Sequence, residues 1–230
     1  MSVTTHERPG VYSEYDASSV VQGRQGRKMV GMAAIHATAP AGVPQTVTSY
    51  EGALIAFGST GGQDMTELIR LALKNGAAGV VAVPVADEEG YEAAFAALAA
   101  MDDIGVVICD SVDREVQQSL RDSAAAASAA RRERIAVAAG GAGETVTELL
   151  ERAKALNSER VVLVAPGGTD EEGKAVSGLS LAAAVAGAIA GTTDPALPLG
   201  GAVLSGLYGL ETTYGDNDLD LLIRGGVTPA

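Results

Sequence analysis

Acidic side chains follow two apolar runs that could form neighbouring strands of a parallel sheet. Asp110 comes directly after the run VVIC, and Asp87 comes shortly after the run VVAVPV. Open parallel sheets bind ligands beyond the carboxyl ends of their strands, where a carboxylate could hold a metal ion or accept a phosphoryl group. Alternatively, Asp110, Ser111 and Asp113 cap the helix that follows. We favour capping, because no Lys or Thr partner stands out at another predicted strand end.

Two glycine-rich stretches could act as phosphate-binding loops, GGAGET at 140–145 and STGGQDMTE at 59–67. Glycine amides at the start of a helix can surround an anion. The stretch at 140–145 lacks the Lys and Ser/Thr of a Walker loop and the full Gly-x-Gly-x-x-Gly spacing, and Glu144 would repel a phosphate. The stretch at 59–67 fails similarly. We interpret both as loops that lead into capped helices.

The residues that could support nucleophilic catalysis are few and scattered. Cys109 lies inside an apolar run, where a thiol is usually a small inert hydrophobe. His6 lies near the N-terminus, His36 ends a predicted strand, and the sequence holds no Gly-x-Ser-x-Gly elbow. We therefore expect no catalytic residues, no cofactor and no metal site, and we expect a protein that is not an enzyme.

The composition excludes several classes of partner. The chain has 230 residues, 47% of them apolar, with 16 basic and 29 acidic side chains and a formal charge of −13. Such a charge offers no general attraction to nucleic acid or to anionic lipid. The longest weakly polar run, at 179–191, falls short of the roughly 20 residues that span a bilayer. The first ten residues lack the apolar core of a signal peptide. We expect no nucleic-acid partner, no membrane partner, and assembly in the cytosol.

Apolar runs and amphipathic segments alternate along most of the chain. This alternation predicts the α/β class, with a mostly parallel sheet covered by helices on both faces. The predicted strands are 28–37, 79–85, 104–110, 134–139 and 160–166, and the predicted helices are 49–58, 64–75, 88–101, 112–131, 144–156, 178–190 and 216–224.

Residues 1–27 differ in composition from the rest of the chain and are predicted to form an extended N-terminal arm. They are rich in Ser, Thr, Arg, Gln and Gly, and the Arg8-Pro9-Gly10 sequence disfavours helix. The alternation of Val11 and Tyr15 with polar residues suits a strand that forms only when a sheet edge is supplied. The predicted organisation is therefore an arm at 1–27, an α/β core domain at 28–225 and a linker at 226–230.

The segment Pro9-Gly10-Val11-Tyr12 resembles the N-terminus of contractile-tail sheath proteins of bacteriophages and phage-like bacteriocins, most closely the short sheath proteins of Gram-positive prophages. Further features follow in the family's order, namely the element at 49–58, the Asn75-Gly76-Ala77 turn and DPALPLGGAVLSGLYGL at 194–210. The resemblance covers essentially the whole chain.

The resemblance implies a structural subunit of a contractile tail sheath. Its expected partners are other sheath subunits in hexameric rings stacked helically, a tail tube protein, a baseplate and a tail terminator. Contraction would drive the tube through the target envelope, and the particle, a virion or a phage-tail-like particle, would assemble in the host bacterial cytoplasm. The arm would add a strand to a neighbour's sheet through an interface that includes Arg8, Pro9, Gly10, Val11, Tyr12 and Tyr15.

Two further expectations accompany this hypothesis. Family members usually continue past the GGVTP sequence into another domain, so 226–230 is expected to be a truncated linker in a chain that lacks the C-terminal domain. The alternative function is a small α/β nucleotide- or metal-binding enzyme domain that uses Asp110 and the loop Gly140–Glu144.

Overall fold

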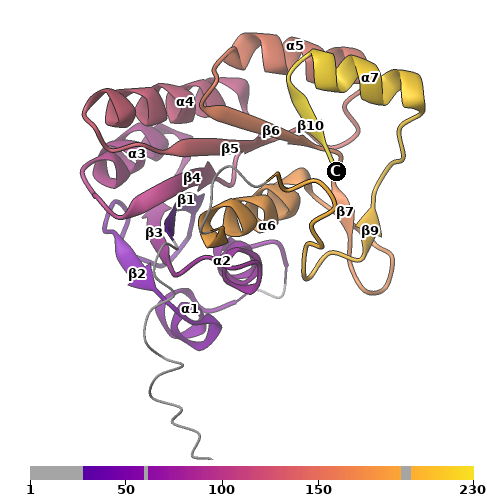
Figure 1. Ribbon diagram of the computed structural model, residues 1–230. Helices are drawn as coiled ribbons and strands as arrows, with labels where there is room; N and C mark the ends of the chain where they lie inside the picture. Colours follow the sequence, from indigo (N-terminus) through magenta and orange to yellow (C-terminus); the bar gives the residue numbers. More distant parts are fainter. Residues whose placement is uncertain (1–27, 60–61, 193–197) are drawn as a thin grey trace, which may run out of the picture.

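A seven-stranded, mostly parallel sheet organises the chain (Figure 1). The computed structural model describes residues 28–59, 62–192 and 198–230. All strand pairs of the sheet are parallel except β2–β3, which is antiparallel. In spatial order the strands are β10 (Val227–Pro229), β6 (Val161–Ala165), β5 (Ile135–Ala139), β4 (Ile104–Cys109), β1 (Met29–Ile35), β3 (Val80–Val85) and β2 (Gln45–Val47).

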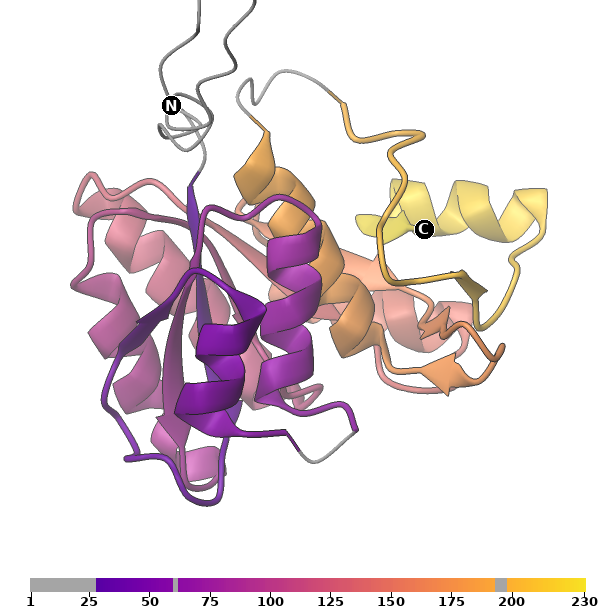
Figure 2. The same ribbon diagram turned by 90° about the horizontal axis from the view of Figure 1, so that it is seen from below.

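Helices cover both faces of this sheet, as Figures 1 and 2 show. One face carries α1 (Tyr50–Phe57), α2 (Met65–Lys74) and α6 (Gly178–Gly191), and the other carries α3 (Tyr91–Ala99), α4 (Arg114–Ala129), α5 (Val146–Leu156) and α7 (Asp216–Arg224). A 3₁₀ turn, η2 (Glu88–Gly90), precedes α3. The predicted fold class is therefore confirmed for the described residues.

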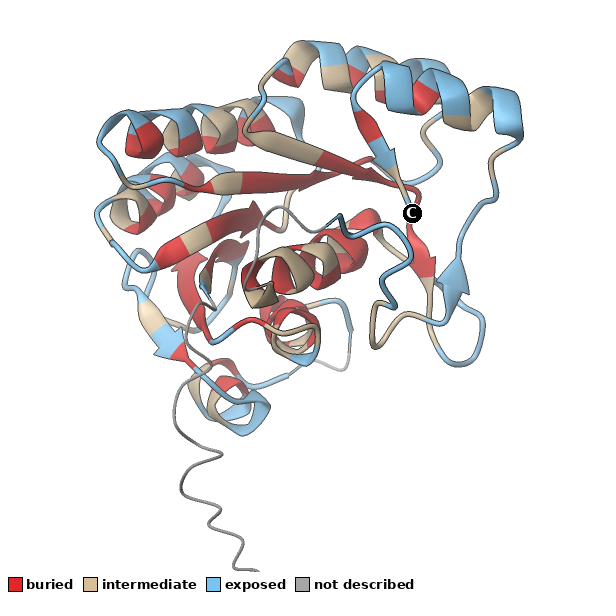
Figure 3. Cartoon of the chain, in the orientation of Figure 1, coloured by how far each residue is buried: buried red, intermediate tan, exposed pale blue. Residues whose placement is uncertain are grey.

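Alternating side chains of the central strands build the two halves of the core. On β4, Val106 and Ile108 pack toward the α2 and α6 side, whereas Val107 and Cys109 pack toward α3 and α4. Strands that are buried on both faces need apolar residues at every position, which explains the continuous apolar runs in the sequence. Figure 3 shows that buried residues concentrate in these strands and on the helix faces that cover them.

Helix α6 packs unusually close to α2. A Cβ atom at Gly187 would overlap the carbonyl oxygen of Ala72, and one at Gly191 would lie 2.8 Å from the carbonyl oxygen of Gly76. The two glycines are four residues apart and therefore lie on the same side of the helix. They let the two backbones touch, which holds this side of α6 firmly against α2.

The chain end corrects the predicted organisation. In place of the linker predicted at 226–230, Val227–Pro229 form β10 and pair with β6, and the Ala230 amide donates to the Ala165 carbonyl at 3.0 Å. Proline is tolerated in β10 because it is an edge strand.

A second, small antiparallel sheet also went unpredicted. It consists of β8 (Ala175–Val176), β7 (Gly168–Thr169) and β9 (Gly209–Leu210) and lies beside the main sheet.

Candidate functional site

Asp110 holds three elements together at the carboxyl end of β4. Its carboxylate accepts hydrogen bonds from the Ile35 amide, at 2.9 Å, and from the Tyr91 hydroxyl. Burial raises the pKa of Asp110, although both hydrogen bonds act in the opposite direction. Burial and the neighbouring carboxylate also raise the pKa of Tyr91. The carboxylate thus joins β1, β4 and α3, a structural role that the sequence did not indicate.

The capping prediction is correct for Asp113 and wrong for Asp110. The Asp113 carboxylate accepts from the amides of Glu115 and Val116 at 2.8 and 3.1 Å, and the Ser111 hydroxyl accepts from the Asp113 amide at 3.1 Å. Asp110 lies four residues before the first residue of α4, whereas a capping side chain belongs to the residue next to the helix start.

The glycine-rich loop 140–145 is occupied by its own charged pair. The Glu144 carboxylate accepts from the Gly141 amide at 2.9 Å and forms a salt bridge of 2.5 Å with the Arg152 guanidinium. Burial alone would raise the pKa of Glu144, but the hydrogen bonds from Arg152 and Gly141 outweigh it and lower the pKa. The Gly141 amide and the Arg152 guanidinium, two groups that could bind a phosphate, are therefore already bound to the Glu144 carboxylate. Thr145 caps α5 in a capping box with Glu148.

Arg152 is the centre of a buried polar network that the sequence interpretation missed. Its side chain is 6% exposed and also donates to the Val112 carbonyl at 2.6 Å and to the Gln117 side-chain oxygen at 3.0 Å. Arg152 follows Leu149 by three residues and precedes Leu156 by four, so it lies on the buried stripe of α5. That spacing is the signal that could have identified it.

The loop 59–67 also leads into a capped helix. The carboxylate of Asp64 accepts from the Glu67 amide at 2.9 Å and caps α2, as predicted.

Cys109 and His36 do not form a catalytic pair. Burial raises the pKa of the Cys109 thiol to about 12, so the thiolate nucleophile is absent at neutral pH. The Nδ1 atom of His36 accepts from the Ala39 amide at 2.9 Å, and its Nε2 atom donates to the Phe57 carbonyl at 2.8 Å. Both ring nitrogens of His36 are therefore engaged in hydrogen bonds to backbone groups.

Among the described residues, Asp87 takes no part in these strand-end contacts. Asp87 is exposed at the start of η2. Within 28–59, 62–192 and 198–230, no three His, Cys, Asp or Glu side chains gather in a way that could hold a metal ion, and no helix is long and apolar enough to cross a membrane. His6 and the arm residues lie outside the described residues, the latter being Arg8, Pro9, Gly10, Val11, Tyr12 and Tyr15.

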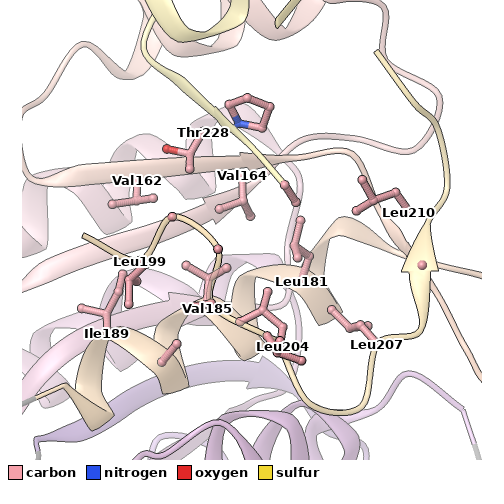
Figure 4. Close-up of a pocket in the computed structure, with 18 residues that line it drawn as sticks. Val162, Val164, Leu181, Val185, Ile189, Leu199, Leu204, Leu207, Leu210 and Thr228 are labelled. Atoms are coloured by element: carbon pink, nitrogen blue, oxygen red, sulfur yellow. The ribbon is translucent and has the colours of Figure 1, made fainter. Parts of the chain in front are cut away.

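An apolar groove of about 660 Å³ opens between α6, the adjacent face of β6 and β10, and the segment 199–210 (Figure 4). The Asn75 side chain anchors this segment to the end of α2 by accepting from the Ser205 amide at 2.8 Å and donating to the Ser205 carbonyl at 2.9 Å. The groove is lined by Val162, Val164, Leu181, Val185, Ala188, Ile189, Leu199, Gly200, Gly201, Ala202, Val203, Leu204, Leu207, Gly209, Leu210, Thr228, Pro229 and Ala230. Side chains of this kind suit the burial of apolar groups rather than bond-making chemistry.

Comparisons with known proteins give a clear structural result. No protein-family model matches the chain, and no curated protein matches it. Among solved structures, the sheath tail protein from Desulfitobacterium hafniense aligns at a TM-score of 0.73 and 13% identity, covering 96% of this chain and 71% of that one.

Two structures of the anti-feeding prophage also align. A chain of its helical sheath in the contracted state gives a TM-score of 0.64 at 20% identity, and a chain of its sixfold-symmetrised baseplate gives 0.61 at 17%. Each alignment covers 98% of this chain and 64% of the other, so this chain spans less than two thirds of their length. At such identities the likeness concerns the fold, and this chain has the fold of contractile-tail sheath proteins along nearly its whole length.

Proposed function

We propose that the protein is a structural subunit of a contractile tail sheath. The observation that carries this proposal is the fold likeness, which extends over 96–98% of the chain to proteins described as sheath or baseplate components. A likeness along the whole chain argues for more than a shared common core, because the connections and the edge strands are included in it.

The use of polar groups at the strand ends supports a role without catalysis. Asp110, Glu144 and His36 all hold neighbouring elements in place. An enzyme of this fold class needs polar groups at these positions that are free to contact a substrate. The alternative of a nucleotide- or metal-binding enzyme domain has no observation in its favour.

The proposed assembly is a stack of hexameric rings around a tail tube, joined to a baseplate and closed by a tail terminator. It belongs to a phage or phage-tail-like particle that assembles in the bacterial cytoplasm, and its contraction drives the tube through a target envelope. The sixfold baseplate and the contracted helical sheath of the structural neighbours support this arrangement. Rigid-body rearrangement of subunits that remain linked is a known way to convert one lattice into another.

The arm at 1–27 is proposed to link neighbouring subunits through Arg8, Pro9, Gly10, Val11, Tyr12 and Tyr15. The sequence supports this assignment, because Val11 and Tyr15 alternate with polar residues as in a strand that pairs with an exposed edge. Few residues of the arm are apolar enough to belong to the core.

Electron microscopy of the full chain with its tail tube protein tests the proposal. We expect striated, tube-bound polymers from the full chain. A variant that lacks residues 1–20 should unfold cooperatively but form weaker polymers. A full chain that stays strictly monomeric and never joins tail particles would overturn the sheath assignment, and loss of cooperative unfolding in the deletion variant would overturn the arm assignment.

A further inference from the structure

Helix α6 is apolar around its whole circumference but is covered on only part of it. Its sequence, GLSLAAAVAGAIAG, holds no charged residue. Helices of this kind are normally buried on all sides. In the described residues, α2 covers one side and the sheet covers another, whereas Val185, Ala188 and Ile189 face the open groove.

The strands beside the groove show the same asymmetry. On one face of β6, Leu163 packs against α5 and α7 with Leu149 and Leu222. On the opposite face, Val162 and Val164 line the groove, which in the described part of the chain is partly covered by the segment 199–210. The rim of the groove adds exposed apolar side chains, since Leu199, Val203 and Leu210 are 37%, 90% and 38% exposed. This region therefore has room for an apolar segment.

The described chain begins at one end of the groove. The Lys28 amide donates to the Ala190 carbonyl at 2.9 Å, and the Lys28 carbonyl accepts from the Ala78 amide at 3.2 Å. Ala188 and Ile189, immediately before Ala190, line the groove. The attachment point of residues 1–27 is therefore fixed beside the apolar surface.

The distances allow residues 1–27 to run along the groove. Helix α6 has 14 residues, a length of about 21 Å at 1.5 Å per residue. The seven residue steps from Val21 to Lys28 can span up to about 25 Å when extended. A segment tethered in this way has an effective concentration on the order of millimolar at the groove, so weak contacts suffice to seat it.

The chemistry of residues 1–27 also suits the groove. Apart from Met1 and Val3, their apolar side chains lie between positions 11 and 21, and the larger ones there are Val11, Tyr12, Tyr15, Val20 and Val21. The segment carries three arginines and three carboxylates, so it is formally neutral and the whole charge of −13 lies in residues 28–230. Docking therefore meets no net charge repulsion from the rest of the chain.

We propose that residues 11–21 dock in the groove of their own chain when the subunit is free. Their apolar side chains cover Val185, Ile189 and Val203 and complete the burial of α6. This inference goes beyond the sheath proposal, because it concerns the unassembled subunit and holds whether or not the protein forms polymers.

Hydrogen exchange of the monomeric fraction tests the proposal. The full chain is compared with a variant that lacks residues 1–22, and amide exchange is followed at 185–190 and 199–210. We expect exchange in these two segments to be at least about tenfold faster in the deletion variant, which corresponds to about 1.4 kcal/mol of docking free energy. The core strands should exchange equally in both proteins.

Two substitutions in the full chain provide a matched pair. Val203→Asp places a charge on the groove rim and should raise exchange at 185–190 as the deletion does. Ile55→Asp is the control, because Ile55 is 88% exposed, nearly as exposed as Val203, but lies on α1 away from the groove lining. It should leave exchange in the groove unchanged.

Two results would overturn the proposal. Equal exchange in the full chain and the deletion variant would show that residues 1–22 do not cover the groove. Protection that appears only as protein concentration rises would assign the groove to a second copy instead. Since the full chain and the deletion variant are compared as monomers, a failure to polymerise would count against the sheath proposal alone.

Discussion

The strand ends and the α6 groove are two regions of the same sheet with opposite character. At the strand ends, charged and polar groups such as Asp110, Glu144 and Arg152 are partnered by other groups of the chain. In the groove, apolar side chains such as Ile189 and Val203 face open space. The groove thus offers an exposed apolar surface, which suits association with an apolar protein segment.

The difference has a physical cause in the residues themselves. A carboxylate that leaves water needs partners, so Glu144 and Asp110 are stable in their positions only because Arg152, Tyr91 and backbone amides contact them. Exposing an apolar side chain to water costs less free energy than burying an unpaired charge. The folded chain can therefore keep such a side chain exposed until a partner binds. Removing a strand-end partner should therefore damage folding, whereas truncating a groove side chain should spare it.

Arg152→Ala should produce the largest loss of stability. It leaves Glu144 without its counter-ion and removes the hydrogen bonds to Val112 and Gln117. Breaking a buried ion pair by removing one partner costs about 3–5 kcal/mol. Urea denaturation followed by circular dichroism measures the change in the free energy of unfolding.

The control for this prediction is Arg160→Ala. The Arg160–Glu133 salt bridge is partly exposed, with side chains 33% and 67% accessible. Its removal should therefore change stability by at most about 1 kcal/mol. Equal losses of stability in the two variants would contradict the view that the buried network of Arg152 stabilises the fold at this strand end.

Two isoleucines of the α2–α6 layer differ in burial and allow the core to be compared with the groove. Ile69 on α2 is fully buried, whereas Ile189 on α6 is half-buried in the groove wall. Ile69→Ala should cost about 2–5 kcal/mol, as expected for a buried isoleucine. Ile189→Ala should cost less, because part of its surface already contacts water. Both are measured in a variant that lacks residues 1–22. An Ile189 loss as large as that of Ile69 there would show that the groove is closed without the arm.

Features that depend on residues close in the sequence could be predicted, whereas features that depend on distant residues could not. The central strands were predictable, because runs such as VVAVPV need burial on both faces. The cap Asp64 was equally predictable, since a cap lies next to its helix. Strand β10 was missed because its three residues, with a proline among them, form a strand only by pairing with β6, 64 positions earlier at Val227↔Leu163.

The side-chain partners at the strand ends and the groove could not be predicted from local pattern. Asp110 meets Tyr91 across 19 positions, and Arg152 meets Gln117 across 35. The groove combines residues from Val162 to Ala230, which become neighbours only when β10 closes the sheet. Alternation and spacing indicate which residues are buried, but pairing between elements is decided by the packed structure.

Asp110→Asn separates the structural from the catalytic interpretation of the strand end and should have the smallest effect. Because the pKa of Asp110 is raised in the folded state, the native protein binds a proton more readily than the unfolded chain, whose value is about 3.9. Between the two pKa values, the stability of the wild-type protein therefore rises as pH falls, by at most about 1.4 kcal/mol per pH unit.

Asparagine does not titrate in this range. The stability of the wild type relative to the variant should therefore increase on acidification from pH 7 toward pH 4. Denaturant unfolding of both proteins measures this difference. Under the sheath proposal, polymerisation should be unchanged, since the hydrogen bonds of the Asp110 carboxylate in the described residues go to β1 and α3 of its own chain. A stability difference that is independent of pH would contradict the burial argument, and saturable binding of Mg²⁺ or a nucleotide that the substitution abolishes would restore the enzyme hypothesis.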